Sequence, residues 1–402
     1  MKTPLPKTIW VLGFMMFLMN LSYVMVYSFR GIYLKSILGT STTLVGLLEG
    51  IIEATSYLMK LFSGIITDLM QRRKPLIVIG YVLSILSRPM MASCQTFWVV
   101  FTASLMERLG NGIQAPARDA IVADISPPGR IGASYGLKRS LATTGSFCGA
   151  VCGIVAMFLT NNNYQRIFLI ASIPPLIALV ILFYIKEPKP AHSAISAETP
   201  LPAPKRSYRF KWSNFRLLGK VFWGLMAVNA VFMAARVGET FLALHGSHNL
   251  NIPHRWIPTV MMAFNAGWCL SSYPVGVFAD RMNRYWFLIS GIIILVLSSL
   301  ILAHSTQMWV FFTGVFLWGI QYGMTQNIFV SIIAESVPEN LRGTAFGVYY
   351  IICATCAFFA DTLAGFIAQN YGEPRAFLTS SFIGLISLLS LIVFLSNRRG
   401  MN

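Results

Sequence analysis

Charged side chains stand at helical spacing inside a hydrophobic stretch of this chain. Residues 46–75 are apolar enough to enter a membrane, yet they include Glu49, Glu53 and Lys60. With Ser56, these residues follow one another at intervals of four, three and four, so they share one face of a helix. A charge at the centre of a bilayer costs about 2.5–3.5 kcal/mol on insertion scales. The charged face is therefore predicted to point into a polar interior, where such residues bind ions or solutes.

Similar polar faces recur on other predicted helices, and they supply the candidate site residues. Ten residues are candidates for binding a substrate: Arg30, Tyr27, Arg108, Asn111, Gln114, Arg236, Glu239, Asn265, Gln321 and Thr325. Four carboxylates are candidates for binding a coupling proton, because a buried acid can titrate near neutral pH: Glu53, Glu107, Glu49 and Asp361. A purely structural alternative is that some of these acids neutralise cations, for example Arg30 with Glu49 or Glu53.

Two of the arginines indicate the chemistry of the substrate. Arg108 and Arg236 lie in opposite halves of the chain, and a guanidinium binds a carboxylate or phosphate through two parallel hydrogen bonds. A pair of arginines facing each other would suit a small organic anion. The alternative is local neutralisation, of Arg108 by a glutamate of residues 44–67 and of Arg236 by Glu239. The sequence leaves both possibilities open.

The elements that carry these residues are long hydrophobic segments. The chain has 402 residues, of which 55% are hydrophobic and 11% charged, whereas soluble domains carry about 25% charged residues. Segments of about 20 mainly apolar residues predict twelve transmembrane helices. Their predicted bounds are 10–34, 44–67, 76–94, 97–122, 132–160, 165–185, 221–245, 256–279, 286–304, 308–334, 343–370 and 376–396. We therefore predict an all-α membrane protein.

The predicted helices fall into two sets of six. We expect an N-terminal bundle over 1–185, a cytoplasmic linker over 186–220 with eight Lys and Arg residues, and a C-terminal bundle over 221–402. If both termini are cytoplasmic, 19 of the 31 Lys and Arg residues lie on that side and four on the other. This bias follows the positive-inside rule and accounts for most of the net charge of +17, so no nucleic-acid partner is expected.

Two pairs of loop sequences repeat between the halves. GIITDLMQRR at 64–73 matches GVFADRMNRY at 276–285, and ADISPPGRIGASYG at 123–136 matches AESVPENLRGTAFG at 334–347. The offsets of 212 and 211 indicate two homologous bundles related by an axis along the membrane normal. Carboxylates at helix ends can bind arginines or helix N-termini of the other half, so these loops predict a cytoplasmic gate. Its predicted residues are Gly64, Asp68, Arg72, Arg73, Asp124, Gly276, Asp280 and Glu335.

These loops resemble the signature of the major facilitator superfamily. The pattern G-x-x-x-D-x-x-x-R-[RK] stands here as Gly64, Asp68, Arg72 and Arg73, and ERLGNGIQAPARDAIVAD resembles a bacterial twelve-helix branch. The resemblance implies two pseudo-symmetric six-helix bundles that open alternately to either side of the bacterial inner membrane. The glycine run GSFCGAVCG lacks the Gly-Pro of the family's antiporter signature, so antiport is not implied.

The sequence thus predicts a secondary active transporter and not an enzyme. It contains no G-x-x-x-x-G-K-[ST] nucleotide loop, and neither a metal site nor a cofactor is expected. The expected cargo is a small organic anion, such as a carboxylate metabolite or a carboxylate-type siderophore, coupled to H⁺. The expected protein is a monomer in the lipid bilayer. Two alternatives are a proton-coupled multidrug efflux antiporter and a membrane receptor or sensor that does not transport.

Overall fold

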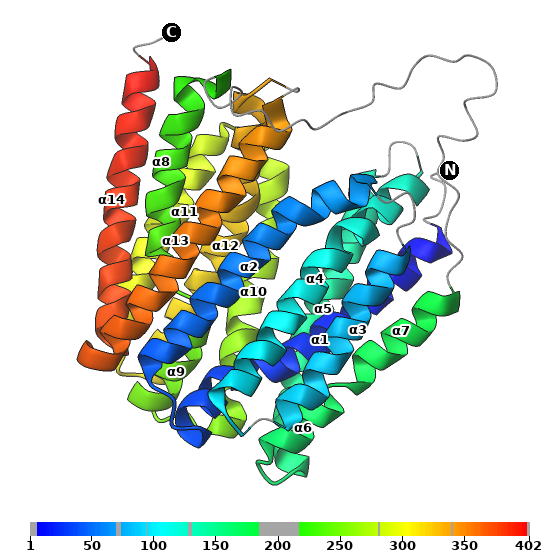
Figure 1. Ribbon diagram of the computed structural model, residues 1–402. Helices are drawn as coiled ribbons and strands as arrows, with labels where there is room; N and C mark the ends of the chain where they lie inside the picture. Colours follow the sequence, from blue (N-terminus) through cyan, green and yellow to red (C-terminus); the bar gives the residue numbers. More distant parts are fainter. Residues whose placement is uncertain are drawn as a thin grey trace, which may run out of the picture.

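The computed structural model describes residues 6–69, 74–93, 95–127, 131–184, 217–279, 282–338 and 341–399, which are helical almost throughout (Figure 1). The first half contains α1 (Lys7–Ile32) with a π-helical turn (Tyr33–Ile37), α2 (Thr42–Leu69), α3 (Lys74–Ala92), α4 (Phe97–Ile125), α5 (Ile131–Leu159), α6 (Tyr164–Ile170) and α7 (Ile173–Tyr184). The second half contains α8 (Gly219–Ala235), α9 (Thr240–Asn249), a 3₁₀ turn (His254–Trp256), α10 (Pro258–Ala279), α11 (Arg284–Ala303), α12 (Met308–Ser336), α13 (Arg342–Tyr371) and α14 (Glu373–Arg399). The described residues form no β-strand, in agreement with the predicted all-α fold.

Ten of the twelve predicted spans are single helices, and the other two are broken. The sixth span divides into α6 and α7, with Pro174 and Pro175 in the first turn of α7. Proline lacks the N–H that would continue the preceding helix, so a new helix begins there. The seventh span ends as α8 at Ala235 and resumes as α9 at Thr240. The span predicted over 221–245 is therefore one candidate membrane span, Gly219–Asn249, whose helix is interrupted at residues 236–239.

The helices have the dimensions of membrane spans. Among the described residues, eight helical segments are long and apolar enough to cross a membrane: Lys7–Ile37, Lys74–Ala92, Ser134–Leu159, Tyr164–Tyr184, Gly219–Asn249, Arg284–Ala303, Arg342–Tyr371 and Glu373–Asn397. Successive spans reverse direction, so an even number of them brings the start of α1 and the end of α14 to one end of the bundle (Figure 1). We call this the terminal end and the opposite one the distal end.

The helices pack as two groups that meet along two seams. In the first group α1 packs on α5 and α7, and α3 packs on α4. In the second group α12 packs on α10 and α11, and α14 packs on α8 and α11. The groups meet where α2 packs along α13 and where α5 packs along α10, with α9 against α1 (Figure 1). The two seams correspond under the sequence repeat, since α2 matches α10 and α5 matches α13.

Contacts at the distal end hold the two groups together. The backbone N–H of Thr42 donates to the Gln369 side chain at 2.6 Å, and the Tyr164 hydroxyl lies 2.9 Å from Nδ1 of His254. Burial lowers the pKa of His254 below its ordinary value, which favours a neutral ring in this contact. On the seam between α2 and α13, a Cβ at Gly46 would lie 2.4 Å from a backbone oxygen of α13, so only glycine allows this approach. The structure is thus closed at its distal end.

Candidate functional site

A cavity of about 370 Å³ lies between the two groups of helices. Its wall is built by α1, α2, α4 and α5 of the first group and by α8, α10, α12, α13 and the segment before α9 of the second. Eleven of the residues selected from the sequence line it: Tyr27, Glu49, Glu53, Glu107, Arg108, Asn111, Gln114, Arg236, Glu239, Asn265 and Asp361. Its volume falls in the range of about 300–1,000 Å³ that small-molecule sites occupy.

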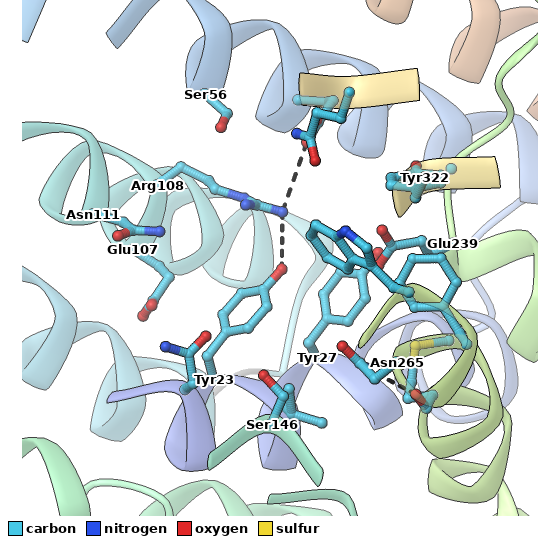
Figure 2. A pocket seen from close by; sticks show the side chains of 18 of the residues that line it. Tyr23, Tyr27, Ser56, Glu107, Arg108, Asn111, Ser146, Glu239, Asn265 and Tyr322 are labelled. Atoms are coloured by element: carbon cyan, nitrogen blue, oxygen red, sulfur yellow. Dashed lines mark hydrogen bonds and ion pairs between the residues drawn. The ribbon is translucent and has the colours of Figure 1, made fainter. Parts of the chain in front are cut away.

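Arg108 projects into the cavity from α4 and has two partners in the first half (Figure 2). Its Nη2 donates to the Tyr23 hydroxyl at 2.9 Å and lies 3.8 Å from Oε2 of Glu53 on α2. The Tyr23 ring in turn stacks on Tyr27, with 5.2 Å between the ring centres. Of the two sequence-based alternatives for Arg108, the structure contains the pairing with a glutamate of α2. At 3.8 Å this ion pair is longer than a hydrogen bond.

Glu49 joins the two halves at the distal end of the cavity. Both of its oxygens lie 2.6 Å from Nη2 of Arg30, and Oε1 also accepts from the Thr240 hydroxyl at 2.8 Å. Arg30 and Glu49 are each 4% exposed, so solvent screens the pair little. The sequence left open which glutamate Arg30 would meet, and the structure selects Glu49. Arg30 itself lies behind the cavity lining.

Glu107 is neutralised by an arginine of α3. Its Oε2 lies 2.8 Å from Nη2 of Arg88 and accepts from the Ser87 hydroxyl at 3.0 Å. Arg88 also donates through Nε to Ser22 at 3.0 Å, so this network ties α1, α3 and α4 together. The two charged side chains are only 3% and 10% exposed. Removing one partner of such a buried pair leaves an uncompensated charge, which gives Glu107 a structural role.

The break between α8 and α9 lies in the wall of the cavity. It consists of Arg236, Val237, Gly238 and Glu239. The backbone N–H of Gly238 donates to Oδ1 of Asp361 on α13 at 2.6 Å. A Cβ on Gly238 would lie 2.9 Å from the same oxygen, so a side chain there would displace Asp361. A helix at membrane depth can break where another group satisfies the freed backbone, and Asp361 does so here.

Glu239 and Asp361 differ from the other acids of the cavity in having no cationic partner among the side chains that the structure describes. Among the described residues, no Lys or Arg nitrogen lies within 4.0 Å of either carboxylate. Asp361 is 3% exposed, whereas Glu239 is half-buried at the cavity wall (Figure 2). A buried carboxylate without a counter-cation is costly to keep ionised. These two acids are therefore the ones whose charge is not balanced locally.

Arg236 is the corresponding unbalanced cation of the second half. Within the described part of the chain, no carboxylate lies within 4.0 Å of it, so the pairing with Glu239 is not formed. Its guanidinium carbon lies 3.6 Å from the centre of the Tyr322 ring, and its Nη1 lies 3.8 Å from Sδ of Met233. Arg236 is 9% exposed, and its Nε has no hydrogen-bond partner. A guanidinium stacked on a ring keeps its in-plane donors available for an anion.

Three further cations line the cavity from positions nearer the terminal end: Lys60, Arg118 and Arg139. None of them has a carboxylate within 4.0 Å among the residues that the structure describes. Arg139 reaches across the seam, with its guanidinium carbon 4.6 Å from the centre of the Trp268 ring. Within the described part of the chain, four cations that lack a carboxylate partner, Arg236 among them, share the cavity with two acids that lack a cationic partner. The unbalanced charge of the cavity is therefore positive.

The remaining sequence-selected residues lie elsewhere. Gln321 and Thr325 are fully buried within α12, where the Thr325 hydroxyl donates to the backbone oxygen of Gln321 at 2.7 Å, and neither lines the cavity. Of the predicted gate residues, Glu335 forms an ion pair with Arg284 of the same half. Three others lie outside the described residues: Arg72, Arg73 and Asp280. At four more the structure describes helical backbone but not the side chains: Gly64, Asp68, Asp124 and Gly276.

Sequence reasoning missed an aromatic wall on the second half. Phe264 and Trp268 on α10 and Tyr322 on α12 line the cavity and touch one another. A signal was present, because Phe264 and Trp268 are four residues apart and flank Asn265, a polar residue of the same span. Aromatic residues in a membrane span usually face lipid or pack between helices, so only the fold reveals their place in the wall.

Fold and cavity together define the class of this protein. Twelve spans in two repeated groups, with a polar cavity between them that is closed at one end, form the architecture of a secondary transporter. The described residues contain no group of three His, Cys, Asp or Glu side chains that could hold a metal ion. The chain belongs to the Major Facilitator Superfamily, whose sequence profile matches residues 12–361. It is therefore a multi-pass membrane protein of a family that transports small molecules, and not an enzyme.

Individual proteins that are similar to this chain in sequence or fold are also transporters of this kind or are named for drug resistance. An uncharacterized MFS-type transporter of Methanocaldococcus jannaschii is 25% identical over 394 residues, which cover 96% of this chain and 95% of the relative. The quinolone resistance protein NorA of Staphylococcus aureus is 22% identical over 406 residues, which cover 98% and 97% of the two chains. The crystal structure of a POT family transporter in complex with a thioalcohol-conjugated peptide has a TM-score of 0.77 at 14% identity, covering 99% and 97%. The last likeness concerns the fold alone.

Proposed function

We propose that this protein is a proton-coupled secondary transporter of a small organic anion. The observation that carries the proposal is Arg236, a buried guanidinium in the cavity wall that has no carboxylate partner among the described residues. A guanidinium in this state binds a carboxylate strongly, because two charge-assisted hydrogen bonds form at once. A carboxylate metabolite or a carboxylate-type siderophore offers the required group. Arg108, from the other half, is the second cation that such an anion reaches.

The proposed location is the cytoplasmic membrane of a bacterium, with both termini in the cytoplasm. The distribution of Lys and Arg between the loops supports this orientation. The terminal end is then cytoplasmic, and the cavity closed at its distal end faces inward. We also propose that the protein acts as a monomer, since one chain builds the whole cavity wall. The boundaries at 185 and 221 divide it into the two moving bundles.

We assign the coupling proton to Asp361, with Glu239 as a second acid. Glu49, Glu53 and Glu107 each lie within 4.0 Å of an arginine, so their negative charge is already balanced. Asp361 is buried, lacks a cation among the described residues and binds the backbone of the break that carries Glu239. A carboxyl group that must gain and lose a proton should have no permanent counter-ion, because such an ion would hold it in the ionised form.

Protonation of Asp361 favours anion binding for two physical reasons. Loss of a negative charge from the wall raises the electrostatic potential around Arg236. A neutral carboxyl also accepts the Gly238 N–H about half as strongly as a carboxylate does, which loosens the break that carries Arg236. Proton and anion therefore assist each other's binding, and by linkage each raises the other's affinity. This sign of coupling is that of a symporter.

Transport requires that the distal contacts open while the terminal end closes. The hydrogen bonds at Thr42 and Tyr164 then break, and α2 separates from α13 at the distal end. We propose that Asp68 and Asp280 form the latch that closes the terminal end in that state, as their repeated loop sequences suggest. The other gate residues, Gly64, Arg72, Arg73, Asp124, Gly276 and Glu335, belong to the same repeated loops.

Efflux of lipophilic cations is a second candidate function. The similar NorA protein of Staphylococcus aureus is named for quinolone resistance. The aromatic wall and the acid Glu239 are features that suit such a cargo. The sign of the pH dependence separates the two functions, because a cation competes with the proton and binds more tightly as the pH rises. A receptor that does not transport would bind a ligand but give no flux in proteoliposomes.

Thermal unfolding of the purified protein tests the proposed function. Organic acids, carboxylate chelators with and without iron, and lipophilic cations are compared at two pH values. A ligand at a hundred times its dissociation constant stabilises the folded protein by about 2.7 kcal/mol. We expect stabilisation by acids that grows at lower pH. It should fall to about half in Arg236→Gln, where binding weakens about tenfold, and stay unchanged in the control Arg166→Gln, whose side chain is exposed at the distal end. Stabilisation by lipophilic cations alone would refute the anion cargo and favour the efflux function, which flux in proteoliposomes then tests.

A further inference from the structure

The three rings of the aromatic wall in the second half, Phe264, Trp268 and Tyr322, contact one another and form a continuous surface. The ring centres of Phe264 and Tyr322 are 5.1 Å apart with an interplanar angle of 87°, and those of Trp268 and Tyr322 are 5.7 Å apart at 60°. Close approach of α10 and α12 makes this possible, since a Cβ at Gly319 would lie 2.1 Å from the backbone oxygen of Phe264. Phe264 is almost fully buried, whereas Trp268 and Tyr322 are half-buried and line the cavity.

Guanidinium groups stand at both edges of this wall. Arg236 stacks on Tyr322 at 3.6 Å, and Arg139 of the first half lies over Trp268 at 4.6 Å. Neither has a carboxylate within 4.0 Å among the described residues. By contrast, the tyrosine pair on α1 adjoins Arg108, whose charge is shared with Glu53. The aromatic wall therefore combines unbalanced positive charge, from Arg236 and from Arg139, with rings that line the cavity.

We propose that the transported anion is an aromatic carboxylate. This inference rests on the proposed function and names the substrate class of the same cavity. The carboxylate binds the in-plane donors of Arg236, and the ring packs against Trp268 and Tyr322. An aromatic ring gains from edge-to-face and offset contacts that a saturated ring of the same size does not make, which amounts to about a threefold to tenfold difference in affinity.

The test compares three ligands of one shape on the full-length protein in lipid nanodiscs. These are 2-naphthoate, the saturated decahydro-2-naphthoate and the neutral 2-naphthamide. Calorimetry measures their dissociation constants at one pH, at which the carboxyl groups of the first two ligands are ionised. We expect 2-naphthoate to bind about fivefold more tightly than the saturated acid. We expect the dissociation constant of the neutral amide to be at least about tenfold higher than that of 2-naphthoate, because the amide forms no charge-assisted pair. This comparison needs no variant, so it does not depend on a substitution that impairs folding.

Two substitutions test whether the aromatic wall causes the preference for 2-naphthoate over the saturated acid. Trp268→Leu is expected to abolish the preference for the aromatic acid, whereas the control Trp309→Leu, at a side chain 69% exposed on the outer surface, keeps it. Arg236→Gln is expected to weaken both acids about tenfold and leave their ratio unchanged. Equal binding of the two acids, or an unchanged preference in Trp268→Leu, overturns the aromatic assignment while the anion function stands. Equal binding of 2-naphthoate and its amide overturns the proposed function itself.

Discussion

Replacing Asp361 by asparagine removes one ionisable group from the cavity wall and changes little else. The amide oxygen of asparagine can still accept the Gly238 N–H, which lies 2.6 Å from Oδ1 of Asp361 in the parent protein. Each proton that binds together with the anion makes the dissociation constant change about tenfold per pH unit, since one pH unit corresponds to about 1.36 kcal/mol. Two acids of the cavity, Asp361 and Glu239, have no cationic partner among the described residues, so the parent protein has an upper limit of about a hundredfold per pH unit.

We therefore expect Asp361→Asn to lower the slope of log Kd against pH by one, and to bind the anion more tightly than the parent does at high pH. Calorimetry between about pH 6 and pH 8, in buffers of different ionisation enthalpy, measures both the slope and the proton uptake. The double variant with Glu239→Gln is expected to show no slope. An unchanged slope in Asp361→Asn would refute the assignment of the coupling proton, and a slope that persists in the double variant would refute both acids.

Three further predictions concern stability and gating. Glu107→Gln leaves the charge of Arg88 buried and unpaired, so we expect the free energy of unfolding to fall by about 3 kcal/mol while the pH slope of binding is kept; denaturant unfolding measures the first and calorimetry the second. Gly46→Val places a side chain where a Cβ already meets a backbone oxygen at 2.4 Å, so spin-label distances across the distal end should lengthen, and unchanged distances would contradict the tight seam. Burial lowers the pKa of His254 in the closed state, so the closed state is favoured at neutral pH and loses this advantage as the pH falls through the lowered pKa. The same distances should lengthen on acidification in the parent protein but not in His254→Gln.

The sequence determined the number and course of the membrane spans, but not both of the breaks within them. Lipid favours long apolar segments, so hydropathy alone placed twelve spans close to the helix bounds that the structure has. The two breaks have different origins. The break before α7 follows local chemistry, because Pro174 and Pro175 stand in the sequence. The break before α9 depends on Asp361, which lies 123 residues from Gly238 and reaches it only through the packing of α13.

Helical spacing also determined which polar residues face inward. A charge is so costly in lipid that Glu49, Glu107 and Arg108 had to point toward a common interior, and all three line the cavity. Composition could not distinguish the charged groups that form ion pairs within the protein from those that can bind a substrate or a proton. Each acid and each arginine has several possible partners in sequence, and Coulomb attraction depends steeply on distance in a medium of low dielectric constant.

Only the tertiary structure decided which charges stay unbalanced. Arg30 forms an ion pair with Glu49, and Arg88 forms one with Glu107. Arg236 instead stacks on the ring of Tyr322 and not on a carboxylate. Side chains far apart in the chain form these pairs, so their selection follows from how the two six-helix groups pack against each other. The sequence set the inventory of charged groups inside the membrane, and the packing of the helices set which of them are left to bind a substrate and a proton.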